Sequence, residues 1–320
     1  MRTTSFLRGS GLLAVAAAAA SISASAFAAT ALQPVDLNRP GYAATQPWDV
    51  ADNGTVVGVS DSVGFIYSGG VFTSFVHPDA NLSTTLTGIA ADGTLVGTYW
   101  FGDVDDPTVR GFVYAGGSFS DFVVPGASWT VVRHISTSGR YITGDWRDAG
   151  GVNNGFAFDR STLALTLFPV GDGLTTIVQG VNDQGLVTGS FIRNDGAGGP
   201  SVSGGFVHDL VGGGRTEVLD VNGEARPRFR DINNAGEIVG FVGANAFAGT
   251  LGDWALTTPP AGFTMAAYGN NNTGTVVGYY LDDTTGLASG WISSPVPEPG
   301  PAALLALGLA ALSLRWRRRA

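Results

Sequence analysis

The sequence predicts an all-β fold, a six-bladed β-propeller of four-stranded blades, and three observations carry this prediction. A short pattern built around a turn recurs six times, and the five steps between its closing glycines average 44 residues. Each copy is followed by a second signature, a glycine before an aromatic residue. A period near 44 is typical of a propeller blade when the unit consists of strands. The closing glycines are Gly58, Gly97, Gly144, Gly189, Gly240 and Gly278.

Each copy of the pattern is interpreted as a β-hairpin. The first copy runs from Val50 to Gly58 around the turn Asp52-Asn53-Gly54, and the fifth runs from Ile232 to Gly240. Asn and Gly accept the positive φ angles of a tight hairpin turn, so each copy supplies two strands. The glycine–aromatic signature supplies a third strand, and a fourth follows another Gly turn. The third-strand signatures are Gly64-Phe65, Gly111-Phe112, Gly155-Phe156 and Gly205-Phe206, with weaker forms at Ala246-Phe247 and Gly290-Trp291.

The sixth unit ends at Ile292 and is one strand short. The segment from Ala31 to Leu37, before the first hairpin, supplies a spare strand. Adding it to the last blade closes the ring and hides two sheet edges that would otherwise be free to pair. We therefore predict a closed propeller, with an open β-solenoid as the alternative.

The amino terminus has the order of a secretory signal. Arg2 and Arg8 precede an apolar stretch from residue 11 to 20, and small residues follow up to Ala28. This order predicts a signal peptide over residues 1–28, cleaved after Ala28 by the general secretion route. A permanent membrane anchor is the alternative interpretation. The repeat domain then spans residues 29–294.

The carboxyl terminus, residues 295–320, has three parts. It contains Val296-Pro297-Glu298-Pro299, an apolar stretch from residue 301 to 314, and an arginine cluster at its end. Fourteen helical residues reach about 21 Å, against about 30 Å for the hydrocarbon core of a bilayer. This short apolar helix is therefore expected to make a transient inner-membrane contact, with the arginines on the cytoplasmic side and the repeats outside.

This tail resembles the PEP-CTERM sorting signal of Gram-negative bacteria, in its Pro297-Glu298-Pro299 triplet, apolar segment and arginine cluster. The resemblance implies cleavage near the triplet by an exosortase-type enzyme, in a host that makes exopolysaccharide and biofilm. From Trp48 to Ile292 the repeats resemble the HAF family of probable extracellular repeats, although Gly-Phe stands here where that family has His-Ala-Phe. This second resemblance implies a surface or extracellular location and no catalytic residue to transfer. A Pro-rich linker before a tail anchor is the alternative for the tail.

Composition excludes several classes of protein. The chain has no Cys, and all 17 basic residues are Arg, so thiolate ligands, iron–sulfur clusters and lysine imines are excluded. Without Glu298 and the six arginines of the two ends, 25 acidic residues and 11 Arg remain, a balance of −14. Such an acidic body is expected to be repelled by nucleic acid, which is therefore not a predicted partner.

Signals for chemistry are few. The histidines are His77, His134 and His208, without the spacing of a metal motif, so we predict no metal site and no cofactor. The third repeat is richer, and its side chains form an alternative catalytic cluster that could bind an acidic sugar and abstract a proton, as a polysaccharide lyase requires. Exposed cross-strand pairs explain the same residues equally well. The cluster consists of Arg133, His134, Tyr141 and Asp145.

Aromatic residues recur after the hairpin glycines, where they could form a rim on which sugars stack. Packing between blades is the alternative, and the spacing does not distinguish the two. These candidate glycan-contacting residues are Tyr99, Trp100, Trp146, Tyr279 and Tyr280. Acidic loops at residues 103–106 and 282–283 could offer oxygen ligands to calcium, although neither has a complete calcium-loop signature.

Together these features predict a secreted or cell-surface, non-catalytic protein of the exopolysaccharide and biofilm matrix. Its propeller face would bind glycan or a partner protein. Two alternatives stay open at this point: an extracellular polysaccharide lyase or hydrolase on the same propeller, and a structural scaffold without a ligand.

Overall fold

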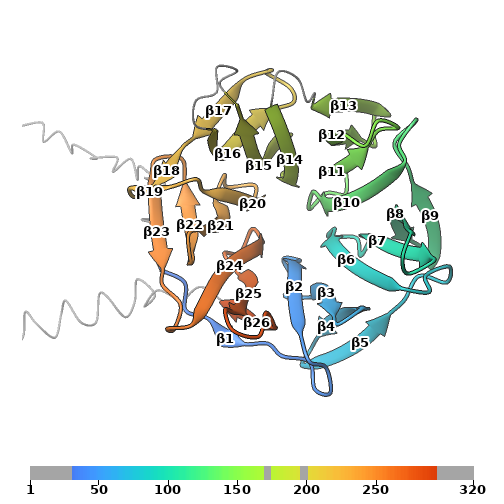
Figure 1. Cartoon of the computed structure of the whole chain (residues 1–320), viewed down its shortest axis with the longest axis horizontal. Helices are drawn as coiled ribbons and strands as arrows, with labels where there is room; N and C mark the ends of the chain where they lie inside the picture. Colours follow the sequence, from blue (N-terminus) through green and yellow to red (C-terminus); the bar gives the residue numbers. More distant parts are fainter. Residues whose placement is uncertain (1–30, 169–173, 195–200, 294–320) are drawn as a thin grey trace, which may run out of the picture.

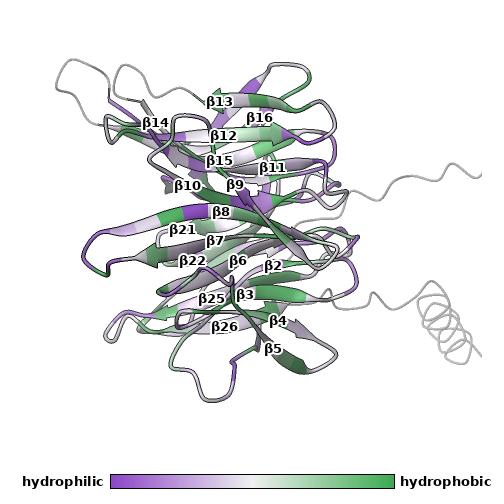
Figure 2. Cartoon of the chain, turned by 90° about the vertical axis from the view of Figure 1, so that its right-hand side faces the viewer, coloured by the Kyte–Doolittle hydropathy of each residue, from purple (hydrophilic) through white to green (hydrophobic). Residues whose placement is uncertain are grey.

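A computed structural model describes residues 31–168, 174–194 and 201–293 of the 320-residue chain. Six four-stranded antiparallel sheets surround a common axis, so the chain is a six-bladed β-propeller (Figure 1). In the side view of Figure 2 the strongly hydrophobic colour lies mostly on the strands. The predicted signal peptide, Ala28 and the tail at 295–320 lie outside the described residues. Within those residues, no helix is long and apolar enough to cross a membrane.

Each of the first three blades consists of four consecutive strands. Blade 1 contains β2 (Thr45–Val50), β3 (Val56–Ser60), β4 (Val63–Ser68) and β5 (Val71–Phe75). Blade 2 contains β6 (Ser83–Ile89), β7 (Leu95–Gly102), β8 (Pro107–Ala115) and β9 (Ser118–Phe122). Blade 3 contains β10 (Trp129–Ile135), β11 (Tyr141–Arg147), β12 (Asn153–Asp159) and β13 (Ala164–Phe168).

The remaining blades follow the same order, with one addition. Blade 4 contains β14 (Leu174–Val181), β15 (Leu186–Arg193), β16 (Val202–Asp209) and β17 (Arg215–Val218). A two-stranded hairpin that the sequence analysis did not predict follows, formed by β18 (Asp220–Val221) and β19 (Glu224–Ala225). Blade 5 contains β20 (Arg228–Ile232), β21 (Ile238–Val242), β22 (Asn245–Thr250) and β23 (Asp253–Thr257). Blade 6 contains β24 (Phe263–Asn270), β25 (Val276–Asp282) and β26 (Ala288–Ser293).

The amino-terminal segment completes blade 6, as predicted. Strand β1 (Val35–Asp36) pairs antiparallel with β26, in the sheet order β1-β26-β25-β24. The Leu37 amide extends this pairing by donating to the Gly290 carbonyl at 2.8 Å. The ring is therefore closed, and the open solenoid is excluded.

Inside each blade, the closing glycine of the first signature contacts the aromatic ring of the second. Gly58 on β3 pairs with Phe65 on β4, and a Cβ at position 58 would lie 2.8 Å from the Phe65 ring. The same geometry joins Gly278 to Trp291 in blade 6. Only glycine leaves room for these fully buried rings, which explains why glycine closes every repeat.

The first strand of every blade carries a β-bulge at the same place. In β2 the register shifts between Pro47 and Asp49, and in β10 between Val132 and His134. The other four first strands shift at the equivalent step. A bulge adds one residue to a strand and re-aims the side chains around it. These six strands lie nearest the axis (Figure 1), so the bulges determine which side chains meet there.

Candidate functional site

In each first strand, the bulge directs two consecutive residues toward the axis. The six first strands therefore place two layers of residues around it. We call the first the arginine layer; it consists of Trp48, Thr87, Arg133, Gln179, Arg230 and Tyr268. We call the second the carboxylate layer; it consists of Asp49, Gly88, His134, Gly180, Asp231 and Gly269. The carboxylate layer therefore alternates between a polar side chain and glycine from one blade to the next.

In the carboxylate layer, three side chains from blades 1, 3 and 5 meet. His134 Nε2 lies 3.5 Å from an Asp49 oxygen and 3.3 Å from an Asp231 oxygen. All three side chains are buried. The glycines of the other blades provide the space: a Cβ at Gly180 would strike the Asp231 carboxylate, and one at Gly269 would lie 2.7 Å from the Asp49 Cα.

Both carboxylates of this layer tie two blades together. The Asp49 oxygens accept from the Val50 amide at 2.7 Å and from the Ile89 amide of blade 2 at 2.8 Å. Asp231 repeats the arrangement, accepting from the Ile232 amide at 2.8 Å and from the Asn270 amide of blade 6 at 2.9 Å. Hydrogen bonds to charged acceptors are stronger than neutral ones, so these contacts fix both carboxylates in place.

Burial by itself lowers the pKa of His134, but the charges of Asp231 and Asp49 outweigh it and raise this pKa well above 6.5. Without any other cation, the imidazole is therefore protonated and shared between the two carboxylates. Its Nδ1 is buried and has no hydrogen-bond partner among the described residues.

The hairpin turns form a ring of hydrogen bonds beside the carboxylate layer, and we call this the turn ring. The side-chain amide of Asn182 donates to the backbone carbonyl of Asn233 at 3.0 Å. In the same way, the Asn233 side chain donates to the Asn271 carbonyl at 3.0 Å, and the Asn271 side chain donates to the Ala51 carbonyl at 2.9 Å. These bonds run from blade 4 through blades 5 and 6 to blade 1. The turns have the predicted hairpin geometry, with positive φ at Gly54 and its equivalents.

The arginine layer contains two arginines, and one of them is bonded to a buried carboxylate. Arg133 Nε donates to Asp145 at 2.8 Å, and Asp145 also accepts from the Val178 amide at 3.3 Å. Burial raises the pKa of Asp145, although Arg133 opposes this shift. Among the described residues, no carboxylate forms an ion pair with Arg230.

Aromatic rings hold the second arginine. The Arg230 guanidinium lies 4.7 Å from the Tyr268 ring centroid and 5.1 Å from that of Phe241. Trp48 packs edge-on against Tyr268 at 4.9 Å, and Tyr279 stacks on it at 4.7 Å. Burial raises the pKa of Tyr279, whose hydroxyl donates to the Tyr268 hydroxyl at 2.6 Å.

Two donors in this layer have no acceptor within the described part of the chain. They are Arg230 Nε and Trp48 Nε1, both buried. Burial also lowers the pKa of Arg230, with Arg133 adding repulsion. The arginine layer thus combines excess positive charge, unpaired donors and flat aromatic faces. These are the groups that bind a carboxylate or another planar anion attached to a ring.

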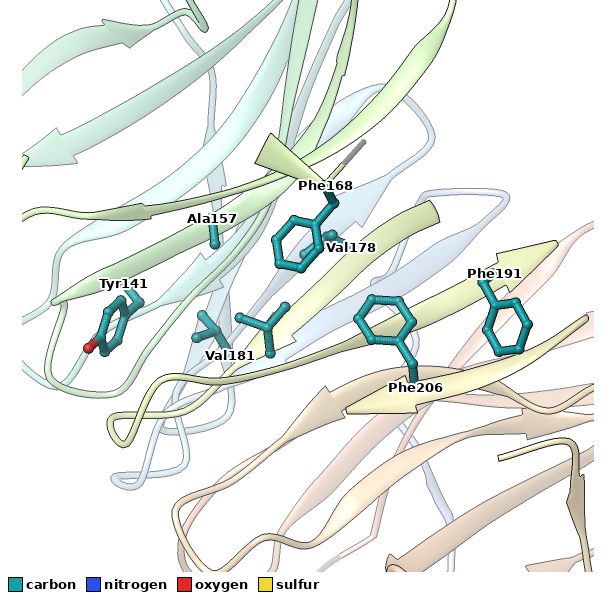
Figure 3. Close-up of a cluster of buried hydrophobic side chains, with 8 residues drawn as sticks. Tyr141, Ala157, Phe168, Val178, Val181, Phe191 and Phe206 are labelled. Atoms are coloured by element: carbon teal, nitrogen blue, oxygen red, sulfur yellow. The ribbon is translucent and has the colours of Figure 1, made fainter. Parts of the chain in front are cut away.

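Of the four residues of the alternative catalytic cluster, the structure pairs Arg133 with Asp145 and places His134 and Tyr141 elsewhere. Arg133 and Asp145 lie in or beside the arginine layer, whereas His134 lies in the carboxylate layer. Tyr141 belongs to a hydrophobic cluster with Val178 (Figure 3). Neighbouring residues of this repeat therefore lie in different environments, and the four side chains do not form one acid–base site.

The five candidate glycan-contacting aromatics also separate. Tyr99 is buried and stacks on His77 at 3.8 Å, and Tyr280 packs near Trp291 in the blade 6 core. Trp146 is half-buried beside the core between blades 2 and 3.

The other two have different environments. Trp100 is 40% exposed, and Tyr279 lies next to the arginine layer. The aromatics therefore form no single rim. Alternation along a strand explains this, because neighbouring positions face opposite sides of the sheet.

The acidic loops use their carboxylates as turn caps. Asp103 accepts from the Asp105 amide at 3.0 Å, and Asp282 accepts from the Thr284 and Thr285 amides at 2.8 Å. Among the residues that the structure describes, the one group of three His or acidic side chains close enough to share an ion is Asp49, His134 and Asp231.

Sequence reasoning missed this group because its members come from repeats 1, 3 and 5. A signal was present: the residue just before the first residue of each copy of the hairpin pattern is Asp, Gly, His, Gly, Asp and Gly in the six repeats.

A further cavity of about 310 Å³ lies between blades 2 and 3, away from the axis. Phe122, Ile142 and Phe158 provide apolar walls, and Asp121 and Arg160 provide charge. This volume is at the lower end of the range for ligand pockets.

Comparison with known proteins finds no matching family model and no matching curated protein. Solved structures with a similar arrangement include TolB from Acinetobacter baumannii, at 13% identity and a TM-score of 0.44, covering 78% of this chain and 63% of TolB. A prolyl endopeptidase has 13% identity and a TM-score of 0.43, with 81% of this chain and 43% of that one covered. An arginine-to-alanine variant of AofleA from Arthrobotrys oligospora has 12% identity and a TM-score of 0.39, with 83% and 90% covered. The chain thus spans less than two thirds of the first two proteins.

Proposed function

We propose that this protein is an exported, non-catalytic component of the exopolysaccharide matrix that binds an acidic glycan at the arginine layer. The observation that supports it best is the charge balance of this layer: Arg133 is ion-paired with Asp145, whereas the buried Nε of Arg230 has no hydrogen-bond partner among the described residues. The repeat domain as a whole is strongly acidic, with the balance of −14 noted above. A local excess of positive charge on such a body favours an anionic ligand at that place.

The chemistry of the layer suggests how a uronic acid would bind. The carboxylate of the uronic acid would accept a hydrogen bond from Arg230 Nε, which has no acceptor among the described residues. Its sugar ring would lie against Trp48 or Tyr268, whose faces are partly exposed. Charge-assisted bonds between guanidinium and carboxylate are stronger and more directional than those between neutral groups, so an acidic sugar is preferred over a neutral one.

Delivery to the cell surface is part of the same proposal. Residues 1–28 would direct export and then be removed, and the tail at 295–320 would hold the chain at the inner membrane until an exosortase-type enzyme cuts near Pro297-Glu298-Pro299. The intact mass of the mature protein tests this step. A mature chain that still contains Arg315 to Ala320 would show that the tail is not removed.

Co-sedimentation with the host's own exopolysaccharide tests the binding role, with new reducing or unsaturated sugar ends measured in the same sample. We expect binding without new ends, and we expect Arg230→Gln to lose most of it. The matched control is Arg140→Gln, which removes the same charge from an exposed arginine in the blade 3 hairpin turn.

Two results would overturn the proposal. New sugar ends would identify a lyase or hydrolase. Absence of binding to the glycan would favour a scaffold or a protein-binding role.

A further inference from the structure

We propose that Asp49, His134 and Asp231 hold one divalent transition-metal ion on the propeller axis, with Zn²⁺ as the best fit. One candidate ligand atom from each residue lies within 4.8 Å of the other two. The distances from His134 Nε2 to the carboxylates, 3.5 and 3.3 Å, match the edges of a tetrahedron whose metal–ligand bonds are about 2.0–2.1 Å. The inference is independent of glycan binding at the arginine layer.

The charge of the group suits a dication. Two buried carboxylates and a neutral imidazole carry a charge of −2, which one divalent ion cancels. Burying uncompensated charge is costly, and metal binding removes that cost by replacing a proton on the imidazole. An imidazole with two carboxylates suits zinc or manganese better than calcium, which prefers six or more oxygen ligands.

The space next to the ligands is also suited to an ion. A cavity of about 10 Å³ lies beside Asp49 and His134, and it is lined by turn residues that include Ala51 and Thr137. That volume is about what one water molecule requires, so a water can complete the coordination. Asn270 lines the same cavity, and its buried Oδ1 has no hydrogen-bond partner among the residues that the structure describes. This unpaired acceptor points independently to a ligand, because a metal-bound water would donate to it.

The surrounding backbone holds the ligands in the required geometry. Each carboxylate oxygen of Asp49 and Asp231 accepts one amide hydrogen bond and keeps a further lone pair. Outer hydrogen bonds of this kind orient the ligands of metal sites. Glycines at 180 and 269 let the backbones of blades 4 and 6 lie close to the carboxylates, because a Cβ at either position would contact Asp231 or Asp49.

The position of the site indicates a structural role for the ion. Its ligands come from blades 1, 3 and 5, so one ion would cross-link alternate blades across the axis. Asn272 of blade 6 donates to Thr137 Oγ1 of blade 3 at 3.2 Å, which covers the site on the turn side. A ligand that binds the folded ring but not the unfolded chain stabilises the fold.

The test uses the protein purified after export, without chelator. We expect metal analysis to find one transition-metal ion per chain. After dialysis against a chelator, Zn²⁺ alone should restore one ion per chain and raise the melting temperature by about 5 °C or more at saturation. Asp231→Asn should lose both effects. The matched control is Asp145→Asn, an equally buried carboxylate beside the arginine layer, which should still bind one ion.

A second measurement covers the case in which Asp231→Asn fails to fold. NMR spectra of wild-type protein loaded with Co²⁺ should show that one imidazole is a ligand of the ion. The ring protons of His134 should be strongly shifted, and those of His77 and His208 should not. Failure to retain an ion, together with no thermal shift on adding Zn²⁺, would overturn the proposal in favour of an ionic cluster without metal. Retention of the ion by folded Asp231→Asn, or shifted protons on another histidine, would place the ion elsewhere and overturn it too.

Discussion

The two layers around the axis differ by one position along the same strands, yet their chemistry is opposite. In the carboxylate layer, Asp49 and Asp231 have partners for every oxygen, and the turn ring covers them. In the arginine layer, Arg230 and Trp48 retain donors without acceptors in the described part of the chain. The first layer is therefore built to hold the ring together, and the second is left with bonding capacity for something outside the chain.

The β-bulge explains how adjacent residues serve both purposes. In a regular strand, consecutive side chains face opposite sides of the sheet. The bulge brings two consecutive residues to the axis in each first strand, as with Arg230 and Asp231 in β20. Six bulged strands therefore place twelve residue positions around one axis. Their division into two layers lets the fold tolerate the unpaired donors of one layer, because the neighbouring layer is firmly bonded.

The largest expected effect comes from filling the carboxylate layer. Gly180→Ala would drive a methyl group into the Asp231 carboxylate and the Ile232 amide. Such overpacking should cost about 3 kcal/mol or more in the free energy of unfolding, measured by urea denaturation.

Gly54→Ala is the control, because position 54 has open space and a positive φ of 81°. It should cost about 1 kcal/mol through backbone strain alone. Equal costs for the two variants would show that the carboxylate layer has no special need for space.

The next effect tests whether the turn ring stabilises the carboxylate layer. Asn233 donates to the Asn271 carbonyl and accepts from the Ala235 and Glu237 amides at 3.0 Å. Asn233→Ala should therefore cost about 2 kcal/mol in the free energy of unfolding, because buried partners lose their hydrogen bonds. Hydrogen exchange should increase first at the turns of blades 5 and 6. A variant as stable as the wild type would contradict a structural role for the ring.

A smaller effect on stability is expected in the arginine layer. Arg230→Gln removes a buried cation that has no ion-pair partner within the described ranges, so the free energy of unfolding should change by less than about 1 kcal/mol. Thermal and urea unfolding of this variant measure the change. A loss as large as that of Asn233→Ala would mean that Arg230 serves the fold rather than a ligand.

The smallest effect concerns His77, which lies in neither layer. Burial lowers the pKa of His77 below 6.5, against the weaker opposing charges of Asp79 and Asp121. The unfolded chain therefore binds this proton more readily, and stability should decrease as the pH falls below about 6.5. His77→Gln should remove this part of the pH dependence, measured from pH 7 to pH 5. An unchanged profile would show that His77 contributes nothing to it, and the remaining dependence belongs to other groups.

Much of the fold could be predicted from the sequence because it depends on local rules repeated six times. The Asp52-Asn53-Gly54 turn and the Gly58–Phe65 contact each lie within one blade, so each repeat shows them separately. The missing strand of the last blade was visible from its length. The hairpin β18–β19 has no counterpart in other repeats, and nothing periodic indicated it.

The sites at the axis were beyond a reading of one repeat at a time. Asp49 and Asp231 each appear alone within their repeats, and they meet His134 only after the ring has closed. Grouping His134 with Tyr141 by proximity in the sequence failed for the same reason, since the two side chains belong to different surroundings. Comparing the same position across all six repeats would have shown the alternation with glycine.

The binding of native and carboxyl-reduced exopolysaccharide to the same protein tests most directly whether the two layers differ in purpose. Carboxyl reduction removes the negative charge of the glycan and leaves its sugar rings. The account predicts that wild-type protein binds the native glycan at least about tenfold more tightly than the reduced one, a difference of about 1.4 kcal/mol, and that Arg230→Gln binds both equally weakly. Equal affinity of the wild-type protein for the two glycans would contradict it.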